Sequence, residues 1–267
     1  MRFADVLLTA FSQLRENKLR SFFTLLGIIV SVTFLVAVVA IIQGMNAYVS
    51  ENLAGALIGQ NTFQVRRSPI QIGLFDDEEF RRIQKRPRIT ESDAQAVIAA
   101  VPNAVAISLQ SGFPAPVADV QWGTRSIGEV AIFGVTPPYQ VVQDYTLASG
   151  RPLMDLDVTQ RRTVAVIGAD VADKLFENAD PVGKDIRVAG THFTVIGVIA
   201  KKGRVLGQSF DGFVLLPLTS FEAVYGRRKT TTVSVKMARA EDIAGAMSAA
   251  DEAMRTAHHL RPGQESD

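Results

Sequence analysis

The chain has 267 residues, 47% of them hydrophobic, and a formal net charge of +1. Such a balanced charge argues against a nucleic-acid partner, because proteins of that class carry a basic excess. The sequence contains no cysteine, which excludes disulfides and thiolate metal sites. The three histidines, His192, His258 and His259, lack the spacing of a metal site.

The first segment, residues 2–16, has the pattern of an amphipathic helix. Apolar residues recur there at intervals of three and four, the period of one helix face. Because a hydrophobic run follows directly, we expect residues 1–18 to form a cytoplasmic helix on the membrane surface. An ordinary helix packed on a core is the alternative. The apolar face of this helix contains Ala10 and five larger residues. We predict that these five contact the membrane surface and take part in coupling: Phe3, Val6, Leu7, Phe11 and Leu14.

The next segment, residues 19–42, organises the rest of the chain. No charged residue occurs between Arg20 and Glu51. About 20 apolar helical residues cross a bilayer core about 30 Å thick, so the run predicts a transmembrane helix. We expect this helix and a stalk to occupy residues 19–58. A buried core helix and a cleaved signal peptide are the alternatives, but a signal peptide has an apolar region of only about 7–15 residues.

The charges beside this run predict its orientation. Arg15, Lys18 and Arg20 precede it, and lysine and arginine near a span stay on the cytoplasmic side. We therefore expect the N-terminus inside the cell and the residues after about 50 outside the cytoplasm. Gly27 and Ser31 are spaced four apart within the span and are candidate helix-packing positions, although small residues also occur in spans by chance.

The exported part begins with the order strand, loop, helix, strand. Residues 61–67 alternate like a strand, and the acidic and basic runs between 76 and 88 are interpreted as a solvated loop. Thr90 and Asp93 have the spacing of a helical capping box. Pro102 ends that helix before a second strand. This order is typical of a βαβ or split-βαβ unit.

From residue 112 the chain is rich in predicted strands. A buried strand at 163–167, a turn at Gly168 and a helix at 169–176 lack the glycine pattern and the lysine of a phosphate site. We expect a β-hairpin that turns at Ala189 and Gly190, and a packing role for Trp122. The last predicted helix, 241–259, places six residues on one face: Ile243, Ala246, Met247, Ala250, Met254 and Ala257.

Residues 17–32 read NKLRSFFTLLGIIVSV, and a series of short motifs follows in the exported part. In chain order these are GRPL (150–153), TVAVIG (163–168), VADKLF (171–176), DPVGK (180–184) and VLLPL (214–218). Together they resemble the MacB/FtsX family of ABC transporter permeases. The resemblance implies an α+β fold, with one N-terminal transmembrane helix and a porter-like extracytoplasmic subdomain, 59–112 and 229–267. An inserted β-rich, sabre-like subdomain would occupy 113–228.

The resemblance also implies a last porter strand and further spans after residue 267. We therefore expect a chain truncated before those spans, with one open sheet edge. The implied function is a permease subunit of the bacterial cytoplasmic (inner) membrane. This subunit would transmit ATP-driven motion to its extracytoplasmic domain, for export or for lipoprotein, peptide or drug handling.

The implied partners are a cytoplasmic ABC ATPase, a second permease subunit in a homo- or heterodimer, membrane lipid, and a periplasmic adaptor or substrate protein. ATP would bind the partner ATPase, so we expect no catalytic residue, cofactor site or metal site in this chain. The alternative is a single-span, membrane-anchored binding or sensor module without transport activity. A membrane-tethered hydrolase is disfavoured, because the sequence has no Gly-x-Ser-x-Gly motif.

Overall fold

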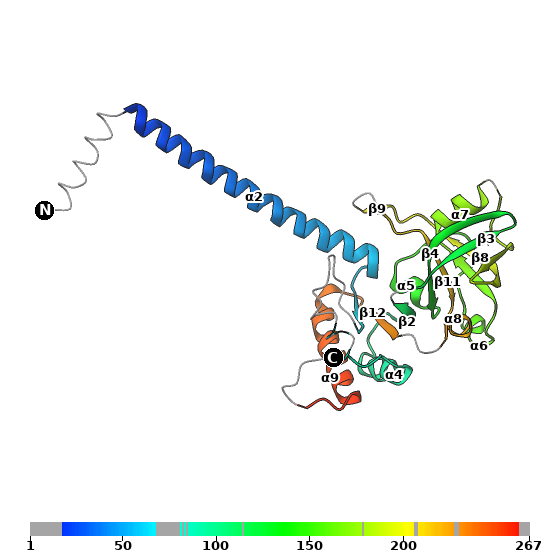
Figure 1. Ribbon diagram of the computed structural model, residues 1–267. Helices are drawn as coiled ribbons and strands as arrows, with labels where there is room; N and C mark the ends of the chain where they lie inside the picture. The colour runs from blue at the N-terminus through cyan, green and yellow to red at the C-terminus, as the bar shows by residue number, and fades with distance from the viewer. Residues whose placement is uncertain are drawn as a thin grey trace. The chain divides into compact units, whose positions relative to one another are not determined.

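The computed structural model describes residues 18–67, 81, 83, 85–113, 115–177, 179–205, 208–226 and 230–261. The chain divides into two compact units, Met1–Asn52 and Leu53–Asp267. The described residues of the first unit belong to helix α2, Lys18–Ile58, a helix of 41 residues that ends in the second unit (Figure 1).

Helix α2 carries the segment predicted to span a membrane. The most apolar 18 residues of its stretch Lys18–Gly44 have a mean hydropathy of 3.0, and none of them is buried. Leu19 and Phe34, for example, are 76% and 71% exposed. A core helix of a soluble protein would bury such side chains, so the structure argues against that alternative and favours a lipid-facing helix.

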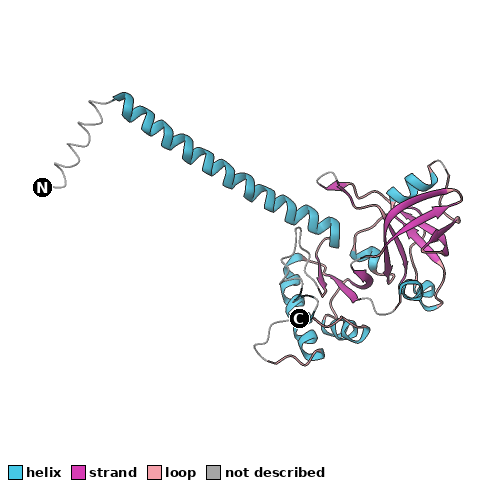
Figure 2. Cartoon of the chain, viewed as in Figure 1, coloured by secondary structure: helices cyan, strands magenta, loops and turns pink. Residues whose placement is uncertain are grey.

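The second unit is built on one mixed sheet of ten strands (Figure 2). The strand order is β1-β12-β2-β4-β11-β6-β8-β7-β3, and β5 pairs with β8. The strands are β1 (Thr62–Val65), β2 (Ala106–Phe113), β3 (Val117–Trp122), β4 (Arg125–Val135), β5 (Leu147–Gly150), β6 (Val164–Ile167), β7 (Asp185–Val188), β8 (Thr191–Ile199), β11 (Phe213–Pro217) and β12 (Thr230–Lys236).

A separate two-stranded antiparallel sheet consists of β9 (Arg204–Val205) and β10 (Gln208–Ser209). The described helices of the second unit are α4 (Glu91–Ala100), α5 (Tyr139–Val142), α6 (Asp155–Thr159), α7 (Ala169–Phe176), α8 (Leu218–Tyr225), the 3-10 turn η1 (Ala240–Asp242) and α9 (Ile243–Ala257). The architecture is therefore α+β, as the sequence predicts.

The strands β1, β12 and β2 form a split-βαβ unit. β1 and β2 each pair antiparallel with β12, which lies between them, and α4 connects β1 to β2 along the chain. Thr90 caps α4, and the Thr90–Asp93 capping box is present. The sequence predicted a βαβ or split-βαβ unit here, and the structure shows the split form, because a strand from more than a hundred residues later enters it.

One face of this three-stranded part packs against α4 and α9. Phe63, Leu109, Val233 and Val235 supply the sheet side of that core. The helices supply Ala94, Val97, Ala246, Ala250 and Met254. The predicted apolar face of the last helix is therefore largely confirmed, and Met247 lies on it beside Ala250 and Met254. Met247 is 51% exposed, because it lies beyond the edge of the core.

The remaining strands surround two other hydrophobic cores. The β7–β8 hairpin turns at Ala189 and Gly190, both at positive φ, which confirms the predicted turn. Trp122 packs on Phe176 with ring centroids 4.7 Å apart, as expected for a packing residue. A Cβ on Gly168 would lie 2.1 Å from the Asp211 carbonyl oxygen, so close packing of two backbones explains this glycine.

Candidate coupling site

The predicted coupling residues fall into two groups. Lys18 and Arg20 lie exposed in the first turn of α2. The other residues lie outside the described part of the chain: Phe3, Val6, Leu7, Phe11, Leu14 and Arg15. Their roles as a membrane-surface face and as topology anchors therefore stay predictions.

Gly27 and Ser31 lie one helical turn apart on α2. The Ser31 hydroxyl donates to the Gly27 carbonyl oxygen at 2.8 Å, and Thr24 bonds in the same way to Arg20. These bonds satisfy the hydroxyl groups inside the helix, which suits a helix surrounded by lipid. A Cβ on Gly27 would meet no atom within 4 Å. The helix-packing role of the pair stays a prediction.

The segment between α2 and β1 is a short link, Gly59–Asn61. Gly59 has φ +83°, and a Cβ there would lie 2.0 Å from the Val142 carbonyl oxygen. Only glycine accommodates both the positive φ and this close backbone approach. The link is therefore packed tightly against the end of α5.

Hydrogen bonds hold the link from two sides. The Gln60 amide donates to Asp144 Oδ2 at 2.7 Å, and the Thr62 hydroxyl donates to the Val142 carbonyl oxygen at 3.3 Å. On the other side, the Met237 amide donates to the Asn61 carbonyl oxygen at 2.9 Å. The link thus bonds both to the segment after α5 and to the end of β12.

Lys236, the last residue of β12, joins these two sides. Its ammonium donates to Asp144 Oδ1 at 2.7 Å and to the Gln60 carbonyl oxygen at 2.9 Å. The Lys236 side chain is only 15% exposed, and that of Asp144 is 42% exposed. We call Gln60, Asp144 and Lys236 the link clamp.

The clamp shifts the acidity of Asp144. Partial burial acts to raise its pKa, but hydrogen bonds from Lys236 and the Gln60 amide outweigh burial and hold the pKa below its usual value. A carboxylate with a lowered folded-state pKa stabilises the fold above its unfolded-state pKa. This contribution is lost as the pH falls through the lowered value, so the clamp is intact at neutral pH.

Sequence reasoning did not find the clamp. Asp144 and Lys236 are separated by 92 residues, and neither belongs to a motif. The pairing arises because β12 enters between β1 and β2, which brings its last residue to the link. No local pattern carries that information.

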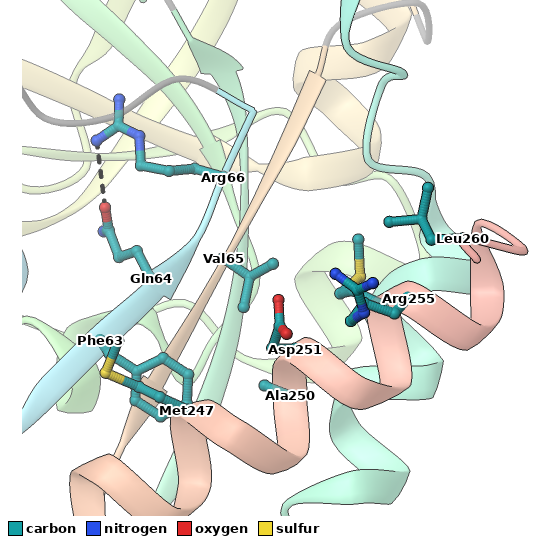
Figure 3. A pocket seen from close by; sticks show the side chains of 10 residues that line it. Phe63, Gln64, Val65, Arg66, Met247, Ala250, Asp251, Arg255 and Leu260 are labelled. Carbon is teal, nitrogen blue, oxygen red and sulfur yellow. Dashed lines mark hydrogen bonds between the residues drawn. The ribbon is translucent and has the colours of Figure 1, made fainter. Parts of the chain in front are cut away.

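A second feature is a cavity of about 200 Å³ between β1 and α9 (Figure 3). β1 is the end strand in the order of the sheet. The lining residues are Phe63, Gln64, Val65, Arg66, Met247, Ala250, Asp251, Met254, Arg255 and Leu260. Within the described ranges, no group of three or more His, Asp or Glu residues is arranged to hold a metal ion. The cavity is thus bordered by the end strand of the described sheet, and apolar side chains such as Phe63 and Met247 line it together with the charged Asp251.

The sequence has relatives among macrolide exporters. Residues 21–253 match the family described as the MacB-like periplasmic core domain. The macrolide export ATP-binding/permease protein MacB of Chlorobaculum tepidum is 31% identical over 97% of this chain, and the match covers 38% of that protein. Its counterpart in Bdellovibrio bacteriovorus is 27% identical over 96% of this chain and is also covered to 38%. The chain thus spans about two fifths of the length of these relatives.

Solved structures share the fold of about three quarters of the chain. The periplasmic region of MacB from Actinobacillus actinomycetemcomitans gives a TM-score of 0.62 at 20% identity, covering 78% of this chain and 88% of that one. The extracellular domain of the noncanonic ABC-type transporter YknZ from Gram-positive bacteria gives 0.58 at 20% identity, covering 75% and 96%. With the family match over most of its length, the chain belongs to the MacB/FtsX family of ABC transporter permeases and carries a MacB-like periplasmic core domain.

Proposed function

We propose that this chain is the mechanical part of an ATP-driven transporter: it relays motion from a cytoplasmic ATPase to its extracytoplasmic domain. The observation that carries the proposal is the direct path along the chain. One uninterrupted helix, α2, leads from the apolar stretch to the three-residue link, and the clamp fixes that link to the sheet. A stiff helix joined to a fixed link can transmit displacement, whereas a flexible linker would absorb it.

The proposed partners follow from the relatives. Those proteins are named ATP-binding/permease proteins, and this chain matches 38% of their length. No Walker A motif occurs in the chain, so ATP would bind to a partner ATPase. A second permease subunit, membrane lipid and a periplasmic adaptor or substrate protein complete the proposed assembly. The proposed subdomains are the porter-like 59–112 and 229–267 and the inserted 113–228.

Co-purification of an ATPase tests this function. The full-length gene product would be extracted gently from its native membrane and probed for an associated ATPase. We expect co-purification for the wild type and loss of the ATPase in Phe11→Asp and Leu14→Asp, which place charge on the proposed coupling face. Ser12→Asp, on the opposite face, is the matched control and should retain it. A stable, membrane-inserted protein without an ATPase would favour the anchored binding module instead.

The orientation can be tested with single cysteines, because the chain contains none of its own. We expect an impermeant thiol reagent to label Ser126→Cys, an exposed position on β4, in cells with a permeabilised outer membrane. Ser12→Cys should react only after the inner membrane is broken, because the positive charges beside the span stay inside. Labelling of residue 12 in unbroken cells would contradict the proposed topology.

A further inference from the structure

The two faces of the split-βαβ sheet differ in chemistry. The face under α4 and α9 is apolar, as described above. The opposite face carries residues that are polar and nevertheless buried: Thr62, Ser108, Thr232 and Ser234. Helix α5 packs against β2 and β12, and the bond from Thr62 to Val142 places α5 on this polar side. The contact between α5 and this three-stranded part of the sheet is therefore a polar seam.

Some buried polar atoms on both sides of the seam have no hydrogen-bond partner among the described residues. Gln143, directly after α5, is fully buried, and this holds for both its Nε2 and its Oε1. The Nε2 of Gln140 and the hydroxyl of Ser108 are in the same condition. A buried polar group without a partner opposes folding, in contrast to the packed apolar groups of the other face. On its other side, Tyr139 of α5 packs into an apolar core with Val135 and Phe213 of β4 and β11. The polar seam therefore holds α5 to β1, β12 and β2 more weakly than the core holds α4 and α9 to these strands.

The link clamp crosses this seam. Asp144 follows Gln143 at the end of α5, while Lys236 ends β12 on the sheet side. Their ion pair also holds Gln60, the middle residue of the link. One cluster thus joins the link, the sheet and α5 where packing contributes least.

We propose that the ion pair between Asp144 and Lys236 is a latch that holds the two sides of the polar seam together. When the stalk moves, the second unit changes conformation by separation of the two sides of this seam. The proposal rests on the mechanical function proposed above and deepens it. With the latch closed, displacement of the link moves the sheet and α5 together. With the latch open, the link stays attached to β12 through Asn61, and α5 separates from β12 and β2 while Tyr139 stays packed against β4 and β11.

Hydrogen exchange of the full chain in lipid nanodiscs tests the latch. Lys236→Met and Asp144→Ala should each raise exchange at least tenfold for the amides of Gln60, Val142 and Gln143. The amides of α4 and α9 should stay unchanged, because the apolar core holds them. The control is Glu177→Ala, which breaks the exposed Arg125–Glu177 pair and should leave the seam unchanged. Unchanged exchange of Val142 and Gln143, or an equal rise everywhere, would overturn the proposal.

Charge exchange separates a latch from a general structural contact. Asp144→Lys and Lys236→Glu should each open the seam, and the double variant should restore slow exchange. If the single variants fail to fold, the comparison passes to Lys236→Met and Asp144→Ala. Failure of the double variant to protect the seam when both milder variants open it would contradict an ion-pair latch. No ATPase is involved in this experiment, so its outcome is independent of the co-purification test.

The weakness of the seam has its own test. Gln143→Leu removes a buried amide whose atoms lack partners and leaves a side chain of similar size. We expect the unfolding midpoint of the full chain to rise by about 2–4 °C. Val142→Leu, a change in a neighbouring buried apolar side chain, is the control and should not raise it. A lower midpoint for Gln143→Leu would show that the amide stabilises the seam and would overturn its separability.

Discussion

Replacement of Asp157 by alanine is expected to lower the free energy of unfolding by about 3 kcal/mol. The Asp157 side chain has no exposed surface, and Arg151 donates to both of its oxygens at 2.7 and 3.0 Å. The Met154 amide donates to the same carboxylate at 3.0 Å, and Arg162 lies 3.5 Å away. Alanine leaves the Met154 amide and the guanidinium of Arg151 without this acceptor. Urea unfolding of the full chain in detergent, monitored by a probe in the second unit, measures the loss.

Asp155→Ala is the matched control for this change. Asp155 lies in the same helix, α6, but is exposed. We expect its replacement to change the free energy of unfolding by less than about 0.5 kcal/mol. Equal effects of the two substitutions would contradict the role of the buried ion pair.

The pH dependence gives a second measure of Asp157. Hydrogen bonds from Arg151, against the effect of burial, hold the pKa of Asp157 below its usual value. Its stabilising contribution is therefore full above the unfolded-state pKa and is lost as the pH falls through the lowered folded-state value. The difference in stability between wild type and Asp157→Ala should be constant near neutral pH and should shrink in acid. A difference that grows in acid would contradict this assignment.

Gly59→Ala is expected to have the second large effect. The residue adopts φ +83°, which costs an L-amino acid about 1–2 kcal/mol. The new Cβ would also lie 2.0 Å from the Val142 carbonyl oxygen, so backbone must move. We expect a loss of at least about 2 kcal/mol in unfolding free energy and faster hydrogen exchange of the Gln60 amide.

Gly190→Ala separates the cost of the positive φ from the cost of the close approach to a neighbouring backbone. Gly190 has φ +84°, nearly the same conformation, but a Cβ there meets no atom within 4 Å. Its substitution therefore carries the cost of the positive φ alone, about 1 kcal/mol, without displacing any neighbour. If both glycine variants lose the same stability, the close approach of the link to α5 does not contribute.

Local signals in the sequence predicted much of the fold. The capping box of Thr90 and Asp93 and the turn at Ala189 and Gly190 depend on residues a few positions apart, and both are present. The bounds of α7 also agree with the prediction, because a buried strand, a glycine and an amphipathic helix follow in order. The structure also explains the arginine of the GRPL motif, because Arg151 donates a hydrogen bond to the buried Asp157.

Features that depend on long-range contacts could not be predicted from the sequence. The position of β12 between β1 and β2 depends on pairing across the fold, so the form of the βαβ unit stayed open. The exposure of Met247 depends on where the core ends, which helical periodicity alone does not reveal. The clamp depends on the same long-range pairing, because Lys236 reaches Asp144 only once β12 lies beside the link. Contacts of this kind are formed by topology rather than by motifs.

A distance measurement in the assembled transporter tests the central claim most directly. A spin label at Ser126→Cys in each of two permease copies, reconstituted with the co-purified ATPase, reports movement of the second unit. We predict that trapping with ATP and vanadate shifts the distance distribution, and that Gly59→Ala reduces the shift while ATP is still hydrolysed. An unchanged distance during active hydrolysis would contradict transmission of motion through α2 and the link.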